Sequence, residues 1–155
     1  MADTLIPVVA AYTGAAATAL RELTSSEDIP DTYIPTTMTG HTLVTTTFTN
    51  YTETLYATGS TGATKTIDLA NGTMQLLTLD QACTITLPVT TAGKSFTLVL
   101  TGNFAPTWAA GSGRTLKWAG GTAPARTASA GKYDIYVFSA VDSTDTLGCD
   151  GGRSF

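Results

Sequence analysis

Thr64–Pro88 reads TKTIDLANGTMQLLTLDQACTITLP, and this stretch decides the fold class. Apolar and polar residues alternate in Lys65–Leu69 and again in Thr84–Leu87, which is typical of strands with one buried face. Asn71–Gly72 is a strong hairpin signal, because both residues tolerate the positive φ angles of a two-residue turn. Met74–Leu79 follows as a further strand. The stretch therefore predicts short strands joined by tight turns.

The same pattern continues on both sides of this stretch. Downstream strands are expected at Phe96–Leu100, Thr115–Trp118, Tyr133–Phe138 and Thr146–Cys149. Tyr133–Phe138 is apolar on both faces except at Asp134, which favours a central position in a sheet. Upstream, threonine and aromatic residues predict strands at Leu43–Thr49 and Glu53–Thr58, and no exact internal repeat is visible. The predicted fold class is all-β, an antiparallel β-sandwich or barrel-like domain.

The chain changes character near residue 55. Residues 1–55 are predicted to be an extended N-terminal arm and assembly region, and residues 56–155 the antiparallel β domain. IPDTYIP (Ile29–Pro35) favours an extended course, because each proline disfavours helical angles in the residue before it. Ala15–Leu23 is long enough for two turns of helix, which would not be stable alone. The alternative is an N-terminal strand and loop packed on the chain's own domain.

The composition excludes several classes of protein. The chain has 155 residues, a formal net charge of −4, 43% hydrophobic residues and only 13% charged residues. A disordered chain would be less apolar and more charged, and a nucleic-acid binder would carry a basic surplus. No run is long and apolar enough for a transmembrane helix, and no basic start marks a secretory signal. The low charge favours burial of part of the surface against other subunits; alternatively, threonine hydroxyls keep a monomer soluble.

The residues that commonly carry chemistry form no recognisable motif. His41 is the single histidine, and no nucleophile motif accompanies it, so we expect neither an enzyme nor a metal or other cofactor. GSTGATKT (Gly59–Thr66) departs from a phosphate-binding loop, because Thr64 stands where that loop needs glycine. Cys83 is expected to be a small buried hydrophobe. Cys149 lies in a glycine-rich stretch, and a bond between the two cysteines stays open.

Two tryptophans stand beside glycine-rich loops. Trp108 and Trp118 are candidate loop contacts, because tryptophan stacks on sugars and is enriched in subunit interfaces. The alternative is that both rings close the ends of a small β core. The pattern leaves these uses open.

Several pieces of the sequence occur together in one group of proteins. They are IDLANGTMQLLTLDQACTITLP (Ile67–Pro88), TLKWAGGTAP (Thr115–Pro124), GKYDIYVFSAVDSTDTLG (Gly131–Gly148) and GCDGGRSF (Gly148–Phe155). By their order and spacing, residues 60–155 resemble fibre and head-decoration components of tailed bacteriophages, and ALRELTSSEDIPDTYI (Ala19–Ile34) resembles a leader found in such proteins. The resemblance implies a non-enzymatic virion protein that forms a symmetric oligomer.

Of these components, a head decoration (cement) protein fits best, because 155 residues leave no room for a fibre shaft. The resemblance then implies a homotrimer made in the host cytoplasm and bound to the major capsid protein on the capsid surface, without nucleic acid or membrane as partner. The alternative is a tail-fibre or tail-tip host-binding module that uses Trp108 and Trp118, and a baseplate subunit is a third reading. In the decoration reading the arm contacts the capsid through apolar side chains: Ile6, Val8, Val9, Tyr12, Ile29, Tyr33 and Ile34.

Overall fold

A computed structural model describes residues 8–13, 16–22, 47 and 49–155. The chain divides into two compact units, residues 1–48 and 49–155, and each is described by itself. In the first unit, β1 (Val8–Thr13) and β2 (Ala16–Glu22) form an antiparallel pair with Val8 opposite Glu22. The helix expected over Ala15–Leu23 is therefore wrong for residues 16–22, because pairing with the neighbouring strand satisfies their backbone instead. The strand expected at Leu43–Thr49 falls mostly outside the described residues.

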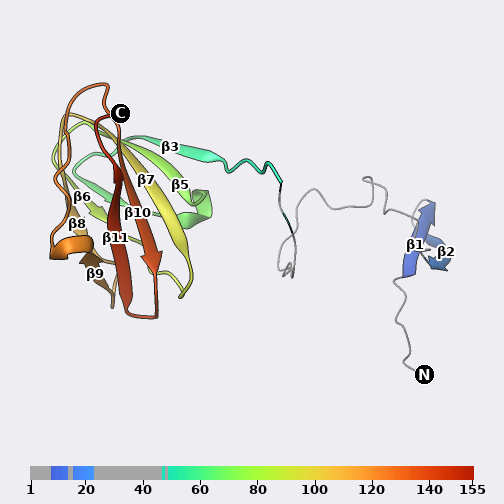
Figure 1. The fold of residues 1–155 in the computed structure, drawn as a ribbon. Coiled ribbons are helices and arrows are strands. Elements are labelled where there is room, and N and C mark those ends of the chain that lie inside the picture. The colour runs from blue at the N-terminus through green and yellow to red at the C-terminus, as the bar shows by residue number, and fades with distance from the viewer. Residues whose placement is uncertain (1–7, 14–15, 23–46, 48) are drawn as a thin grey trace. The chain divides into compact units, whose positions relative to one another are not determined.

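The second unit consists of strands and two short 3-10 turns, and no α-helix occurs among the described residues. Its strands form a six-stranded sheet in the order β3-β5-β7-β10-β11-β9 and a three-stranded sheet in the order β4-β6-β8 (Figure 1). The mostly-β class predicted from the sequence is confirmed. The elements are β3 (Leu55–Ser60), β4 (Thr64–Thr66), η2 (Leu69–Asn71), β5 (Met74–Leu79), β6 (Cys83–Thr86), β7 (Ser95–Gly102), β8 (Pro106–Ala109), β9 (Thr115–Trp118), η3 (Ala119–Gly121), β10 (Asp134–Ala140) and β11 (Asp145–Gly152).

From β3 to β9, successive strands alternate between the two sheets. β3, β5 and β7 lie in the larger sheet and pair in parallel, while β4, β6 and β8 do the same in the smaller one. Each successive pair, β3–β4, β5–β6 and β7–β8, forms one coil of a short stack. In the larger sheet β10 is the one strand that runs opposite to its neighbours. The antiparallel arrangement predicted from the sequence is therefore wrong, and the larger sheet is mixed.

The turn at Asn71–Gly72 explains this difference. Instead of a hairpin, residues 69–71 form η2, and the Asp68 carboxylate caps it by accepting a hydrogen bond from Ala70 N at 2.9 Å. Gly72 follows with a φ of 118°, an angle that L side chains avoid. The side-chain amide of Gln75 donates to the carbonyls of Asp68 and Gly72, at 2.7 and 2.9 Å. This wider turn carries the chain from the smaller sheet to the larger one.

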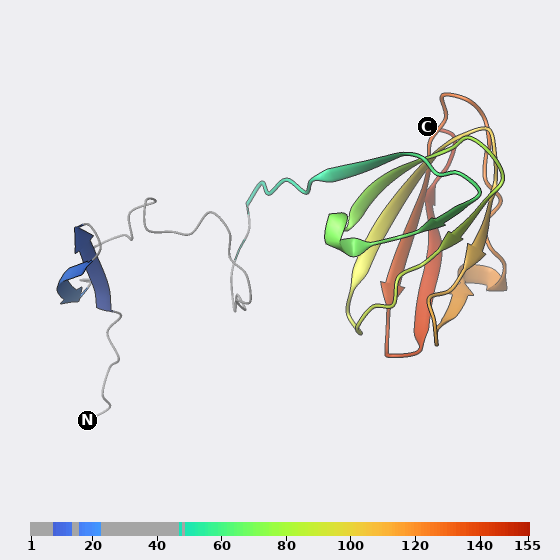
Figure 2. The ribbon, with the colours of Figure 1, turned by 180° about the vertical axis from the view of Figure 1, so that it is seen from behind.

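The two sheets face each other (Figure 2), and buried side chains from both form one hydrophobic cluster. β10 is central between β7 and β11, as predicted, and Phe138 stacks on Phe96 of β7 with ring centroids 5.0 Å apart. Cys83 is buried in this core, which confirms the expectation for it. The buried members of the cluster are Ile67, Leu77, Leu79, Cys83, Ile85, Leu87, Phe96, Leu98, Leu100, Tyr136 and Phe138.

Candidate functional site

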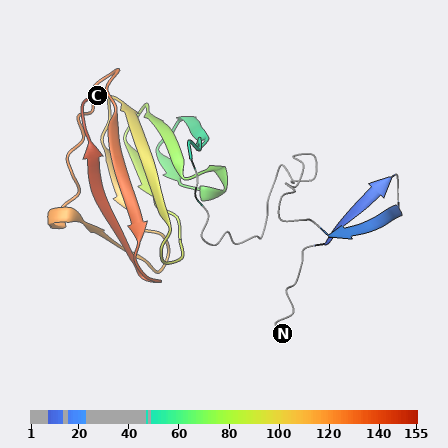
Figure 3. The same ribbon diagram turned by 45° about the vertical axis from the view of Figure 1, so that its right-hand side comes forward.

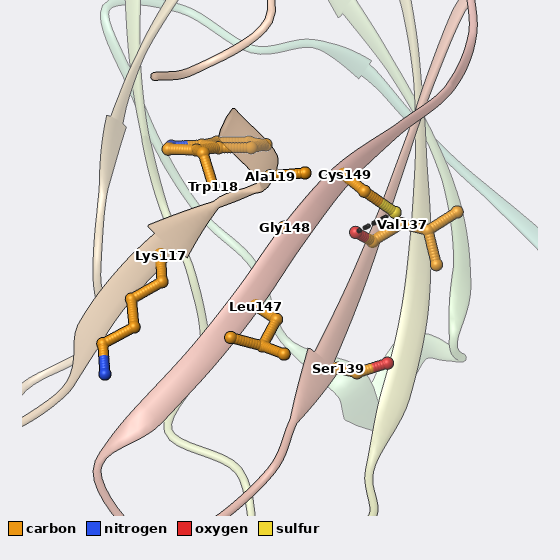
Figure 4. A pocket seen from close by; sticks show the side chains of 8 residues that line it. All are labelled: Lys117, Trp118, Ala119, Val137, Ser139, Leu147, Gly148 and Cys149. Carbon is orange, nitrogen blue, oxygen red and sulfur yellow. Dashed lines mark hydrogen bonds between the residues drawn. The ribbon is translucent and has the colours of Figure 1, made fainter. Parts of the chain in front are cut away.

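A shallow pocket of about 370 Å³ lies over β9, β10 and β11 (Figure 4). The exposed Leu147 and Cys149 of β11 stand on its floor beside Val137 of β10, and the Lys117 side chain extends along one side. The Cys149 thiol donates to the carbonyl of Val137 at 3.7 Å. The pocket is lined by Lys117, Trp118, Ala119, Val137, Ser139, Leu147, Gly148 and Cys149.

Strand register brings these residues together. Leu147 stands opposite Lys117 in β9 and opposite Ser139 in β10, while Cys149 stands opposite Val137. Side chains along a strand alternate between its two faces. Phe138 and Thr146, which neighbour these residues along the chain, are buried and point inward. The local sequences YVFSA and TLGC therefore place Val137, Ser139, Leu147 and Cys149 on the side of the sheet away from the core.

The pocket belongs to a larger surface that we call the outer sheet face. It covers β5, β7, β10 and β11, which lie side by side in Figure 3. Val99 stands between Leu76 and Ile135, and Thr97 between Met74 and Val137. Asp145, at the outward position that begins β11, lies at its margin, and the members named below are uncharged. The outer sheet face consists of Met74, Leu76, Thr78, Ser95, Thr97, Val99, Thr101, Ile135, Val137, Ser139, Leu147 and Cys149, which alternate with the buried residues of these strands.

Charged side chains of β9 and β11 stand at one margin of this surface. The Lys117 ammonium and the Asp145 carboxylate form an ion pair, with 55% of the Lys117 side chain exposed. The hydrogen bond and negative charge of Asp145 raise the pKa of Lys117 above its ordinary value. In the adjoining turn, hydrogen bonds from the backbone of Asp145 and Thr144 lower the pKa of Asp142. At this margin the charge of Lys117 is therefore balanced by that of Asp145, and Asp142 adds one negative charge.

The two tryptophans predicted as loop contacts lie together at the edge of the core. The Trp108 and Trp118 rings meet edge to face at a centroid distance of 5.4 Å, and Trp108 packs 5.0 Å from Tyr136. A Cβ on Gly148 would lie 2.7 Å from the Trp118 ring, so this glycine makes room for the indole. These contacts match the alternative in which both rings close the core, although Trp118 also lines the pocket. Their use as partner contacts stays a prediction.

The predicted arm contacts cannot be placed as a surface. Val8, Val9 and Tyr12 lie in β1, and the structure describes no side chain there. The other four lie outside the described residues: Ile6, Ile29, Tyr33 and Ile34. Their role in binding a partner stays a prediction.

Sequence reasoning missed a buried ion pair at the start of β10. The Arg126 guanidinium and the Asp134 carboxylate are each only 1% exposed, and Arg126 Nη1 donates to Gly102 O at 3.0 Å. Asp134 also accepts from Thr127 N at 2.7 Å and from Ser154 N at 2.9 Å. The charged Asp134 inside an otherwise apolar strand was the available signal, because a buried carboxylate needs a partner.

These contacts set the ionisation of the pair. Burial by itself would raise the pKa of Asp134, but hydrogen bonds from Ser154 and Thr127 and the charge of Arg126 outweigh it, so its pKa is lowered. Burial lowers the pKa of Arg126, against the opposing effect of Asp134. The pair is thus held as a carboxylate and a guanidinium.

The remaining candidates for chemistry can be placed only in part. His41 lies outside the described residues, and Cys83 and Cys149 are both free thiols. Among the described residues there is no group of three or more histidine, cysteine or acidic side chains placed to hold a metal ion. No helix in the described part of the chain is long and apolar enough to cross a membrane.

Comparisons with protein-family models, with curated proteins and with solved structures find no match to this chain.

Proposed function

We propose that this chain is a non-enzymatic structural protein of a virion, a capsid decoration (cement) protein that binds the outer head surface as a symmetric oligomer and stabilises it. The observation that supports the proposal is the outer sheet face, where uncharged and mostly apolar side chains on four strands remain uncovered within residues 49–155. The sequence resemblance to phage head and fibre components indicates that the assembly is a virion. In this proposal the two sheets are the layers of a β-sandwich, because their buried side chains form one cluster.

The physical basis of the proposal is burial repeated over many copies. Covering one aliphatic side chain such as Val137 or Leu147 contributes on the order of 1.5–3 kcal/mol before ordering costs. A shell offers the same site many times, and linked contacts gain strength from their high effective concentration. The N-terminal arm, residues 1–55, would bind the major capsid protein while the β domain stands on the surface. Subunits that otherwise separate would then be held together.

A second candidate is a tail-fibre or tail-tip module that binds the host. The observation that favours it is Trp118, which lines the pocket together with the Ser139 hydroxyl. A sugar ring binds against such a combination of aromatic surface and hydrogen-bonding group. The packing of Trp118 against Trp108 and Phe138 leaves less of its ring for a ligand, so we place this candidate second.

Locating the protein on the particle tests the proposal. Heads that lack the protein would be mixed with the full-length purified chain, pelleted, and imaged by electron microscopy with a label on the chain. We expect saturable binding over the head surface and a higher temperature of head disruption. Label confined to the tail tip, together with Trp118→Ala reducing adsorption to cells but not heat resistance, would support the host-binding module instead.

A further inference from the structure

We infer that Asn71 is the residue at which this chain deamidates spontaneously, and that the Asp68 cap of the η2 turn sets the rate. This reaction of the chain with water is independent of the proposed function. Three features of the described residues carry the choice of site: the residue that follows Asn71, the exposure of its side chain, and the hydrogen bonds of the turn.

The residue after an asparagine decides how easily the side-chain amide is lost, because its backbone nitrogen is the attacking atom. The chain contains three asparagines, and all three are exposed. Asn71 is followed by Gly72, which has no side chain to shield that nitrogen. The other two, Asn50 and Asn103, precede aromatic residues that do shield it. Asn71 is therefore the most reactive of the three by sequence.

The reaction needs only water and involves no oxidation or reduction. The Gly72 nitrogen gives its proton to solvent and attacks Asn71 Cγ, and the new N–Cγ bond closes a five-membered imide. The Cγ–Nδ2 bond breaks, and Nδ2 takes a proton from solvent and leaves as ammonia. Water then opens the imide at Cγ to give aspartate, or at the backbone carbonyl to give isoaspartate, whose main chain runs through the side-chain carbons. Either product carries a carboxylate in place of a neutral amide.

The η2 turn opposes this reaction by holding the two reacting atoms apart. The Gly72 N–H donates to the Leu69 carbonyl at 3.1 Å, and Asn71 Nδ2 donates to the Asp68 carbonyl at 3.4 Å. The backbone angles of a 3-10 turn direct the following nitrogen toward the preceding carbonyl and not toward the side chain. Closing the imide therefore requires rotation about the Asn71 Cα–C bond, which breaks the hydrogen bond to Leu69. The reaction has to wait until the turn opens.

The Asp68 carboxylate sets how often the turn opens. It accepts a hydrogen bond from Ala70 N at 2.9 Å, in a turn of only three residues that contributes no buried side chain. Segments with little buried surface open locally more often than the whole domain unfolds. Loss of one capping residue should therefore raise the open fraction, and with it the rate at Asn71, roughly fivefold.

Conversion of Asn71 would weaken the connection between the two sheets. The new carboxylate lies three residues after that of Asp68, and side chains at this spacing eclipse each other in 3-10 geometry, so two like charges would face each other. Isoaspartate also lengthens the main chain directly before Gly72, whose carbonyl accepts from the Gln75 amide at 2.9 Å. The deamidated chain should therefore unfold at a lower urea concentration than the intact chain.

The experiment follows the three asparagines of the full-length chain during storage in mildly alkaline buffer, with mass spectrometry of proteolytic peptides to detect each amide that becomes an acid. Asp68→Ala removes the cap, and Asp68→Ser keeps an oxygen acceptor at the same position. Asp80→Ala is the matched control, because Asp80 is an exposed residue whose carboxylate accepts one hydrogen bond from Gly62 N at 3.2 Å. In the folded wild-type chain Asn71 should convert first, and in urea it should convert faster still. Asp68→Ala should raise its rate roughly fivefold, whereas Asp68→Ser and Asp80→Ala should match wild-type.

Several results would overturn the inference. Earlier conversion of Asn50 or Asn103 in the folded chain means that the site is elsewhere, and equal rates at Asn71 with and without urea mean that the turn gives no protection. An unchanged rate in Asp68→Ala, or an equal rise in Asp80→Ala, means that the cap does not set the rate. Measurements in urea below the unfolding transition separate local from global opening: the Asn71 rate should stay nearly constant there, and a rate that follows the unfolded fraction refutes the role of the cap.

Discussion

Arg126 Nε lies 3.4 Å from the Asp134 carboxylate, and both side chains are shielded from solvent. Asp134 begins the central strand β10, whereas Arg126 belongs to the segment that precedes it. The same carboxylate holds the backbone of Thr127 and of Ser154 near the C-terminus. One side chain thus fixes a connecting segment and the chain end to the sheet.

Replacing this carboxylate should destabilise the domain strongly. In Asp134→Asn the guanidinium of Arg126 stays buried without its counter-charge, and breaking a buried pair in this way costs about 3–5 kcal/mol. Urea unfolding followed by tryptophan fluorescence measures the loss in the free energy of unfolding. Asp80→Asn is the matched control, because Asp80 is exposed and its carboxylate accepts one hydrogen bond from Gly62 N at 3.2 Å.

The difference between wild-type and Asp134→Asn should depend on pH. Because the folded-state pKa of Asp134 is lowered, the ionised carboxylate contributes stability above its ordinary pKa near 4. That contribution is lost as pH falls through the lower folded-state value. The two proteins should therefore differ most at neutral pH and converge in acid. A gap that is constant with pH, or an equal loss for Asp80→Asn, would contradict the role given to this pair.

The buried Tyr136 should make the folded domain less stable in alkali. Its ring is fully buried, and burial, followed by the charges of Asp134 and Asp150, raises its pKa to about 12. Above pH 10 the unfolded chain ionises this phenol while the folded chain does not, so the free energy of unfolding falls by up to about 2–3 kcal/mol as pH approaches 12. Denaturant unfolding in this pH range measures the slope. Tyr136→Phe should flatten it, and Tyr133→Phe, at a 43% exposed site, should leave it nearly unchanged.

Gln75 should matter more than its polar side chain suggests. Only 1% of the residue is exposed, and its amide satisfies the carbonyls of Asp68 and Gly72 at the turn between the sheets. Gln75→Leu removes both hydrogen bonds: the Gly72 carbonyl loses this donor, while Asn71 still donates to the Asp68 carbonyl. The loss should cost about 2 kcal/mol in the free energy of unfolding. Thermal and urea unfolding measure this loss. Gln81→Leu makes the same chemical change at an exposed site and should change stability by less than about 0.5 kcal/mol; equal effects would refute the role of the turn.

The positions of most strands could be predicted from the sequence, and their partners could not. β5 (Met74–Leu79) and β9 (Thr115–Trp118) begin and end where the sequence predicts, because turn residues and strand-forming residues are local signals. Pairing depends on how the chain crosses between layers. At Asn71–Gly72 the sequence favours a hairpin, but the cap from Asp68 holds residues 69–71 in a 3-10 turn instead. The alternation of apolar and polar residues does not indicate such a cap.

The candidate site was predictable to a similar degree. Alternation in Phe96–Leu100 already places Thr97 and Val99 on the face opposite the core, as the structure does. The breadth of the outer sheet face depends on which strands lie side by side, and so on the topology that the sequence left open. β8 was missed because Pro106 and the nearby glycines are typical of a loop, although proline is accepted at the first position of a strand. The sequence around Arg126 does not indicate a buried ion pair, because its contact with Asp134 depends on how the chain folds.

The stacked coils have a consequence for how such a protein changes its length. In the smaller sheet Thr64 pairs with Thr84, and Cys83 with Pro106, so each circuit of the chain takes roughly twenty residues and touches only the circuits next to it. One whole circuit can then be gained or lost in evolution while the same ladders close above and below the change. Each added circuit would lengthen the stack by one strand in each sheet. The β10–β11 end, where Asp134 binds the backbone of Ser154, would stay unchanged.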